Sequence, residues 1–552
     1  MNAQQPRFTA LGKLISILLV AGLIGLGVYM IRGGSGKSGD ERAESPEEGS
    51  ASEVAEVKVE VPKLSPPAAF QLKDNTIPIE ISEYAGYAGL IAANGGLDAS
   101  DNSLFVKNHG FKVKLTVKED EDWSELNEGK LAASVTTVDV LAAYGRQLHA
   151  IVPAQIGFSR GADGLVVRSD IKRINQLKGK TIATAQFTEV DFFIRYLAQE
   201  AGLEINAIGS LDAQPHPERL NLIYTEEGFG AGDLFLSDIK SGKSRLAGCV
   251  TWEPKVSEVV AGSGGQAHVL TTNRNLLIIA DVLIVHRGFA EQQPKIVEGL
   301  VQGLLEGNRM VRDRPDQYLD VVGRAFKWSR EETKKELANV HLANLPENRA
   351  FFSGAIDAAG SFGGIYQSAV LAYGSDLIKD PPDPSRFFDG KYLDAMEKSG
   401  LFKEQTVAIA PIRSGSATSV ETDPLLSKDI RFLFEPNSST LDLSNQENIK
   451  NLEAIKRLVQ VSPGSTLLLR GHVDNSKVAD FRRQGGEAYV RQMALKAMEL
   501  SKNRASEIRR LLVDRYNVDA KRLDIVGRGW EEPGGPDPDK NRRVEVQWFT
   551  LE

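Results

Sequence analysis

Hydrophobic and polar positions between residues 76 and 402 change repeatedly from the spacing of a strand to that of a helix. Lys112 to Val117 alternates like a half-buried strand, and Val190 to Glu200 has helical spacing before Gly202. Short apolar runs predict further strands at 77–81, 148–153, 165–167 and 181–183. Strands that alternate with helices are typical of a mainly parallel sheet with helices on both faces, so residues 76–402 are expected to form an α/β domain.

A second pattern covers residues 427–552. Strands are predicted at 430–434, at 466–470 and in the phrases LDIVGRG and RRVEVQWF, and helices at 449–459 and 501–513. This order predicts a smaller α+β domain of the βαβαββ type. Residues 403–426 between the two domains are rich in Ser, Thr, Gly and Pro, which predicts a linker.

The N-terminal part has a different composition. Residues 14–31 read LISILLVAGLIGLGVYMI, and as a helix this uncharged run would be about 27 Å long, close to the hydrocarbon thickness of a bilayer. No clear A-x-A site follows it, so we expect a single retained transmembrane helix with residues 1–13 in the cytoplasm. Residues 32–75 are rich in Gly, Ser, Glu and Pro and are expected to form a disordered stalk.

Charge and motif content argue against two classes of function. The 552 residues include 66 Lys and Arg against 74 Asp and Glu, a net charge of -8, which does not suit a general nucleic-acid binder. Cys249 is the sole cysteine, and the seven histidines form no ligand-like pair. The phrases GxSxG, HExxH and GxxxxGK[ST] are absent. We therefore expect neither an enzyme nor a bound metal or cofactor.

Three phrases near the C-terminus have a familiar order. They are GHVDN at 471–475, LSKNRA at 500–505 and NRR at 541–543, and together they resemble an OmpA-like peptidoglycan-binding domain. The resemblance implies that Asp474 binds the ammonium group of diaminopimelate and that Arg504 binds its carboxylate. Such a zwitterion needs one acid and one forked base close together.

The same resemblance adds two candidates and two departures. Asn475 and Arg543 are expected at the peptidoglycan pocket, although Arg543 has the alternative of pairing with an acid for stability. Ala497 stands where the family has Asn, and residues 478–499 are inserted. The insertion either folds over the pocket or contacts another partner.

Phrases in the large domain resemble type II periplasmic substrate-binding proteins of the nitrate, sulfonate and thiamine-precursor group. They are SRGADGLVVRSDIKRINQLKGKTIAT at 159–184, TEVDFFIRYLAQEAGL at 188–203, AGCVTWEP at 247–254 and EYAGYAGLIAANGGL at 83–97. The resemblance implies two lobes that close on a small solute, with helix N-termini facing the cleft.

Eight residues follow predicted strands and have side chains suited to a solute. The candidates are Tyr84, Tyr87, Thr136, Thr137, Thr188, Glu189, Trp252 and Glu253. The alternatives are that Thr137 and Thr188 only cap helices, that Trp252 packs at a hinge, and that the tyrosines belong to the core or rim. The solute is either an anion such as phosphate or sulfonate, or an amine gripped by an aromatic ring and a carboxylate.

Together these features predict an inner-membrane, single-pass envelope protein with its bulk in the periplasm. Its expected partners are peptidoglycan, a small solute, the inner membrane, and an ABC permease or another envelope protein. The solute would be captured for uptake or sensing. The alternative is an envelope scaffold or sensor whose α/β domain binds a protein partner.

Overall fold

The computed structural model describes residues 54–118, 121–354, 360–409, 424–432, 434, 438–462 and 464–549. The membrane helix predicted at 14–31 and most of the predicted linker lie outside these ranges. Within them, no helix has the length and apolar character needed to cross a bilayer.

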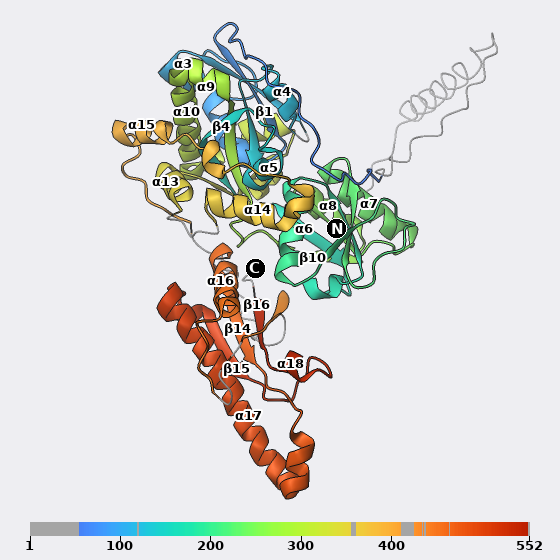
Figure 1. Cartoon of the computed structure of the whole chain (residues 1–552). Coiled ribbons are helices and arrows are strands. Elements are labelled where there is room, and N and C mark those ends of the chain that lie inside the picture. Colours follow the sequence, from blue (N-terminus) through green and yellow to red (C-terminus); the bar gives the residue numbers. More distant parts are fainter. Residues whose placement is uncertain are drawn as a thin grey trace, which may run out of the picture. The chain divides into compact units, whose positions relative to one another are not determined.

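The first lobe of the large domain is a six-stranded sheet with the order β12-β4-β11-β3-β1-β2 (Figure 1). Its strands are β1 (Thr76–Ser82), β2 (Lys112–Lys118), β3 (Ala133–Thr137), β4 (Ala150–Ser159), β11 (Ala280–His286) and β12 (Val340–Leu342). Its helices are α2 (Ala88–Asn94), α3 (Leu104–His109), α4 (Trp123–Asn127), α5 (Val138–Tyr144), α9 (Arg287–Gln292), α10 (Pro294–Asp313), α11 (Leu319–Phe326), α12 (Arg330–Leu337), α13 (Leu345–Ser353), α14 (Phe362–Leu377) and α15 (Lys391–Ser399).

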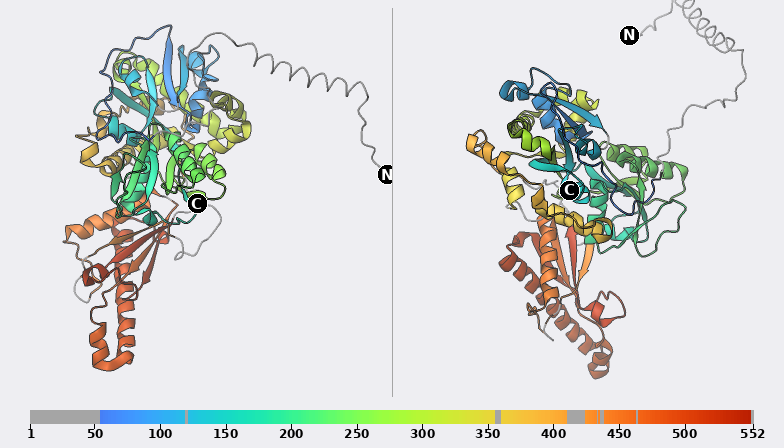
Figure 2. Two further views of the ribbon diagram at one scale, coloured as in Figure 1. Left: turned by 90° about the vertical axis from the view of Figure 1, so that its right-hand side faces the viewer. Right: turned by 45° about the horizontal axis from the view of Figure 1, so that its top comes forward.

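The second lobe is another six-stranded sheet, with the order β10-β5-β9-β6-β8-β7. Its strands are β5 (Asp163–Arg168), β6 (Thr181–Ala185), β7 (Ile205–Ala207), β8 (Leu220–Thr225), β9 (Gly248–Trp252) and β10 (Ala267–Thr272). Its helices are α6 (Glu189–Glu200), α7 (Gly228–Ser241) and α8 (Lys255–Gly262). The two-lobed α/β fold is therefore confirmed, with helices visible around both sheets (Figure 2).

The strand directions correct one expectation. The sheets are mixed rather than mainly parallel: β1 runs parallel to β2 and β3, whereas β11 is antiparallel to β3 and β4. In the second lobe β5 is antiparallel to both β9 and β10. The antiparallel strands lie where the chain crosses between lobes, and this long-range pairing leaves no mark in the local hydrophobic pattern.

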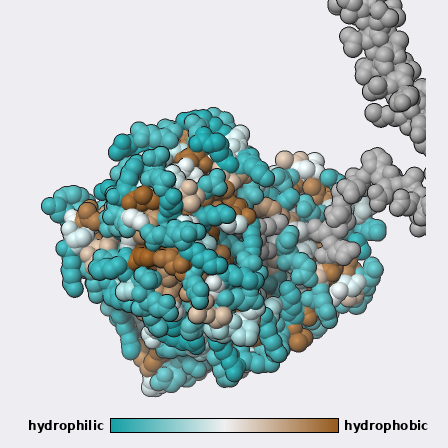
Figure 3. Space-filling view, turned by 90° about the horizontal axis from the view of Figure 1, so that it is seen from above, coloured by the Kyte–Doolittle hydropathy of each residue, from teal (hydrophilic) through white to brown (hydrophobic). Residues whose placement is uncertain are grey.

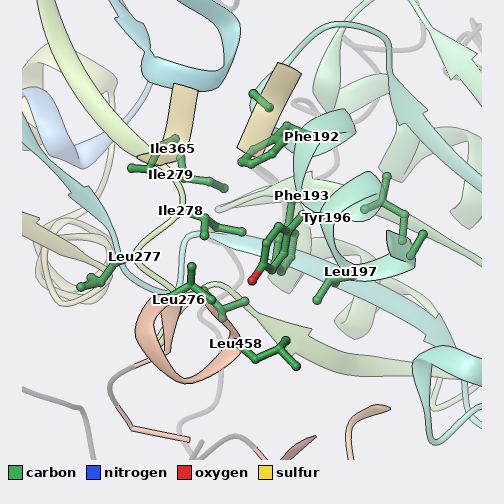
Figure 4. Packing of buried hydrophobic residues seen from close by; sticks show 14 of the residues in the cluster. Phe192, Phe193, Tyr196, Leu197, Leu276, Leu277, Ile278, Ile279, Ile365 and Leu458 are labelled. Atoms are coloured by element: carbon green, nitrogen blue, oxygen red, sulfur yellow. The ribbon is translucent and has the colours of Figure 1, made fainter. Parts of the chain in front are cut away.

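The two-sided burial follows from the alternation of side chains along the strands. In β11, Val282 and Ile284 join the core beneath α5, whereas Leu283 and Val285 join the core beneath α2 and α10. Side chains of α6 and of the crossing segment 276–279 pack together with Ile365 of α14, in a cluster that also includes Leu458 of the C-terminal domain (Figure 4).

The visible face of the molecule is mainly hydrophilic, and its hydrophobic patches are separated from one another (Figure 3). Such scattered patches are ordinary for a folded chain, because polar side chains never cover a whole surface. The view therefore identifies no docking face.

The C-terminal domain has the predicted βαβαββ order. Its elements are β13 (Leu426–Ile430), α16 (Gln446–Val461), β14 (Thr466–Gly471), α17 (Val478–Tyr516), β15 (Leu523–Gly527), α18 (Pro538–Asn541) and β16 (Val544–Phe549), with the sheet order β13-β16-β14-β15. The first strand occupies 426–430 rather than the predicted 430–434, because its register is set by pairing with β16.

The insertion at 478–499 is helical and belongs to α17. The helix breaks at Gly485 and Gly486, where Gly486 has a φ of 61°. Before the break, Phe481 packs edge-on against Tyr489 at 5.8 Å and lies 6.1 Å from the ring of Trp530. Ala497 is buried where α17 passes close to the turn at Gly529.

Residues 54–75 differ from the predicted disordered stalk. They lie extended on the large domain and hydrogen-bond to both lobes, and we call them the strap. In the second lobe, Ala55 N–H donates to the carbonyl of Tyr224 at 2.8 Å. In the first lobe, Ala68 N–H donates to the carbonyl of Asn127 at 2.8 Å. The polar composition of the strap predicted disorder, but hydrogen bonds to distant residues hold it in place.

Candidate functional site

A cavity of about 190 Å³ lies between the two lobes. Seven of the eight predicted solute residues line it, namely Tyr84, Tyr87, Thr136, Thr137, Thr188, Glu189 and Trp252. This volume lies below the ~300–1,000 Å³ of typical ligand sites, so the cavity suits a small molecule.

The first lobe supplies two tyrosines next to an aspartate. Tyr84 and Tyr87 follow β1 and meet edge to face, with ring centroids 5.4 Å apart. The Tyr87 hydroxyl donates to Oδ1 of Asp281 at 3.2 Å. Asp281 is 3% exposed, and its other oxygen, Oδ2, has no hydrogen-bond partner among the described residues. A buried carboxylate oxygen without a partner is costly and points to a missing donor.

The predicted threonines stand at helix starts without capping them. Thr137 and Thr188 occupy the N-cap positions of α5 and α6, yet neither side chain accepts a hydrogen bond there. Thr188 Oγ1 instead donates to the carbonyl of Ala185 at 2.8 Å. The capping alternative is therefore wrong for both side chains.

Two aspartates that no motif indicated, Asp163 and Asp281, line the cavity, and a third, Asp139, lies near them. Asp163 begins β5, and its Oδ2 accepts hydrogen bonds from Ser159 Oγ at 2.5 Å and from Asn273 Nδ2 at 2.7 Å. Asp139 lies in the first turn of α5 and is fully buried. Asp139, Asp163 and Asp281 were not among the candidates from the sequence, because the folded chain brings them together from distant segments; the one local signal was that Asp139 stands two positions after Thr137.

These acids have raised pKa values. Burial raises the pKa of Asp139 to about 7 and that of Asp163 to about 6. For Glu189 and Asp281, burial and the neighbouring Asp163 raise the pKa of each carboxyl well above its usual range. Burial disfavours a charged carboxylate, and like charges add to the effect. Perturbed groups that meet in a cavity are typical of a functional site.

Trp252 and Glu253 separate in space although they are neighbours in sequence. Trp252 lines the cavity and packs on Phe229, with centroids 5.1 Å apart. Glu253 faces away: its carboxylate accepts from Ser257 N–H at 3.0 Å and lies 3.3 Å from Lys335 Nζ of the first lobe. Among the predicted solute residues, Glu253 is thus the one outside the lining, and it links the lobes instead.

Among the described residues that line the cavity, one is a lysine or arginine, namely Lys58 of the strap. Lys58 Nζ lies 3.4 Å from Glu226 at the solvent-exposed rim. The Lys58 backbone is fixed by Gln186, which accepts from its N–H and donates to its carbonyl, both at 2.8 Å. The mouth of the cavity is therefore crossed by a hydrogen-bonded segment.

A second candidate site lies in the C-terminal domain. Asp474 follows β14 and is partly exposed, and its Oδ2 lies 3.6 Å from Arg542 Nη1. Arg504 on α17 donates from Nε to the carbonyl of Ser438 at 3.1 Å and stacks 5.0 Å from the ring centroid of Phe434. Burial and Arg542 lower the pKa of Arg504, and the nearby carboxylate of Asp474 opposes this. The acid and the base predicted from the motifs are thus electrostatic neighbours.

Arg543 was the arginine expected at the pocket, but its neighbour Arg542 lies there instead. Arg543 Nε lies 3.1 Å from Asp429 Oδ1 on β13, so Arg543 holds two strands together, as in the stability alternative. Arg542 faces Asp474 instead, and Asn475 is exposed beside it. Side chains of adjacent residues in an extended segment point to opposite sides, so the two arginines of the phrase NRR looked equivalent in the sequence although one of them lies at the pocket.

Glu545 on β16 forms ion pairs with two neighbouring side chains. Its Oε2 lies 2.9 Å from Arg470 Nη1 and 3.5 Å from His472 Nε2. Burial opposes ionisation, but His472 and Arg470 prevail and lower the pKa of Glu545 to about 2. Glu532 also pairs with Arg470. His472, Glu532 and Glu545 are the one group among the described residues whose ligand atoms lie close enough together to hold a metal ion, and Arg470 already pairs with both carboxylates.

Comparison with known proteins assigns the C-terminal domain. Residues 433–547 match the OmpA family, so this part is an OmpA-like domain as predicted. Outer membrane protein Omp38 of Acinetobacter baumannii is 28% identical over 146 residues, which make up 25% of this chain and 36% of that protein. The match therefore spans about a third of that relative.

Solved structures with a similar large domain include two sulfonate-binding proteins. The aliphatic sulphonate binding protein SsuA of Escherichia coli is 15% identical, with a TM-score of 0.43, and the match covers 57% of this chain and 97% of that chain. The alkanesulfonate-binding protein SsuA of Xanthomonas axonopodis pv. citri, bound to MOPS, is 13% identical, with a TM-score of 0.43, and the match covers 58% of this chain and 100% of that chain.

Proposed function

We propose that this chain is a non-enzymatic envelope protein that binds peptidoglycan through its OmpA-like domain and a small solute between its two lobes. The observation that supports solute binding is the cavity itself, in which residues from distant parts of the sequence converge around unpaired polar atoms. The observation that supports wall binding is the neighbouring acid and base, Asp474 and Arg504.

The location belongs to the same proposal. Residues 14–31 would anchor the chain in the inner membrane, with its bulk in the periplasm, where a wall-binding domain meets peptidoglycan. Mass spectrometry of the native N-terminus tests this anchor. A mature chain that starts after Ile31 would remove it.

Retention on purified peptidoglycan tests the wall site. Asp474→Ala and Arg504→Ala should each lower retention of the full chain roughly tenfold or more, because each leaves the opposite charge of a zwitterion without a partner. Arg510→Ala is the matched control, because Arg510 lies on the same helix and is exposed. Retention that is unchanged in both pocket variants would show that the wall is bound elsewhere.

Thermal shift with a panel of small solutes tests the cavity. A solute that binds only the folded state stabilises it according to its concentration above the dissociation constant, by roughly 2.7 kcal/mol at a hundredfold excess. We expect at least one small polar solute to raise the melting temperature of the full chain. The panel should include anions, cations and neutral compounds of similar size.

The strap favours a second candidate, a scaffold or sensor. Because residues 54–75 hydrogen-bond to both lobes, they restrict how far the cleft can open. A flat response to every solute would favour this candidate, in which the two-lobed domain presents a fixed surface to a protein partner.

A further inference from the structure

The acidic and basic side chains that line the cavity limit the chemical class of solute that it suits. Among the described residues that line it, five are carboxylic acids and one is a lysine. The acids are Glu121, Asp163, Glu189, Glu226 and Asp281. The lysine does not neutralise the interior, because Lys58 pairs with Glu226 at the rim.

The interior acids lack cationic partners. Within the described ranges, Asp139, Asp163, Glu189 and Asp281 form no ion pair with a lysine, arginine or histidine. Asp191 of the second lobe shows the contrast, since it is as buried as Asp139 and pairs with Arg195 at 2.8 Å. The large domain therefore pairs Asp191 with a cation, whereas among the described residues Asp163, Glu189 and Asp281 have no cationic partner, and Oδ2 of Asp281 has no hydrogen bond.

The helix starts do not favour an anion. Helix N-termini attract negative charge through their unpaired N–H groups and the helix dipole. Here α5 carries Asp139 in its first turn, and α6 carries Glu189 and Asp191. The Phe187 N–H before α6 already donates to Asp191 Oδ2 at 3.0 Å. Acidic side chains therefore occupy the helix starts where an anionic solute would need free N–H donors.

The aromatic lining distinguishes an organic cation from a metal ion. Tyr84, Tyr87, Trp123, Phe187 and Trp252 contribute rings to the cavity, and the faces of such rings attract organic cations. In the part of the chain that the structure describes, no three of the cleft carboxyl groups bring oxygens within 4.8 Å of one another. Acids spread around an aromatic cavity suit a larger, softer cation than a divalent metal.

We propose that the cleft binds a small organic cation, an amine or quaternary ammonium compound, with Asp281, Asp163 and Glu189 around its positive charge and the rings of Tyr84, Tyr87 and Trp252 against its carbon atoms. This inference rests on the proposed solute-binding function and names its ligand class. It excludes phosphates and sulfonates as ligands of this cavity.

Choline and isethionate provide a matched test, because both carry a hydroxyethyl group and differ in the sign of their charge. Titration calorimetry of the full chain, with putrescine as a second cation and ethylene glycol as a neutral probe, should show binding of a cation at least tenfold tighter than that of isethionate. Tighter binding of isethionate would overturn the cation proposal and leave solute binding intact. Binding of no probe would overturn both.

Variants locate the site. Asp281→Asn should weaken binding of the cation at least tenfold, and Glu189→Gln, at a partly exposed position, gives the same test if the first variant fails to fold. Asp212→Asn is the control, because Asp212 lies in the same lobe as Glu189 and its side chain is 90% exposed. Equal affinities in the wild-type chain and in folded Asp281 and Glu189 variants would place the cation elsewhere and overturn the proposal.

Discussion

Buried carboxylates in the two domains behave in opposite ways. In the C-terminal domain, Glu545 is held ionised by Arg470 and His472, and its pKa falls to about 2 despite burial. Near the cleft, Asp139 forms no ion pair among the described residues, and burial raises its pKa to about 7. Both side chains are largely removed from solvent, so burial alone does not explain the difference.

This contrast shows that pairing decides whether a buried acid stabilises a fold. A paired carboxylate is a structural element, whereas an unpaired one is a cost that protonation or a bound cation offsets. The C-terminal domain keeps its mixed charges at a partly exposed pocket, which suits a zwitterion. The cleft gathers carboxyl groups without cationic partners among the described residues, and a cation bound there would favour their ionised form.

The largest expected effect comes from changing two buried aspartates of the large domain. Asp191→Asn should destabilise the protein by roughly 3–5 kcal/mol, because it leaves Arg195 buried without its partner. Asp139→Asn should do the reverse and stabilise the ligand-free protein at pH 8 by about 2 kcal/mol. Melting temperatures of the two variants measure whether each substitution raises or lowers stability. A loss of stability in both would show that paired and unpaired buried acids contribute to the fold alike.

The Asp139 effect has a defined pH window. Its folded pKa of about 7 lies above its ordinary value of 3.8, so ionisation opposes folding, and stability falls as the pH rises from about 4 to about 7 and then levels off. Asp163 and Asp191 face it and raise its pKa, whereas the Thr137 hydroxyl lowers it. The gain from Asp139→Asn should therefore vanish at pH 4, where both side chains are neutral.

The paired acid gives the opposite pH dependence. Glu545 has a folded pKa of about 2 against an ordinary 4.5, so its contribution is complete above pH 4.5 and is lost as the pH falls through 2. The loss should amount to about 3 kcal/mol in the unfolding free energy of the C-terminal domain. Urea unfolding between pH 5 and 2 measures it, and Glu545→Gln should flatten the curve. The exposed Asp524→Asn is the control.

A substitution next to Trp252 tests the contribution of the aromatic side chains to ligand binding separately from that of the carboxyl groups, and its expected effect is smaller. A Cβ at Gly228 would lie 1.9 Å from Cζ3 of Trp252, so Gly228→Ala must displace the indole. We expect choline affinity to fall about tenfold, with a loss of stability of roughly 1–3 kcal/mol from overpacking. Gly363→Ala, where a Cβ meets no atom within 4 Å, should leave affinity unchanged. Unchanged affinity in Gly228→Ala would mean that charge alone holds the ligand.

The smallest effect is expected at the rim. Lys58→Ala removes an exposed pair with Glu226 and should change stability by less than about 1 kcal/mol. It also removes the positive charge at the cavity mouth, so choline should bind about two- to threefold more tightly at low salt. Lys63→Ala, also on the strap, is the control for a general change in net charge. Weaker binding in Lys58→Ala would show that the lysine contacts the ligand directly.

The amino-acid sequence alone sufficed for most elements and for the chemistry that adjacent residues carry. Period-two and helical spacing placed β1, β2, β6 and α6 within a few residues, because side-chain burial follows local geometry. The motifs GHVDN and LSKNRA predicted that Asp474 and Arg504 share one pocket. The tyrosines, threonines and Trp252 of the cleft also followed from their positions after strands.

Contacts between distant residues decided the rest. Asp163 and Asp281 are 118 positions apart in the sequence, and pairing across the lobes brings both into one cavity. Contacts between distant residues also place Arg542 rather than Arg543 next to Asp474. They turn Glu253 away from the cavity and hold the strap against both lobes. Local sequence shows which side chains are acidic or basic, but whether a buried charge has a partner depends on distances that only the folded chain sets.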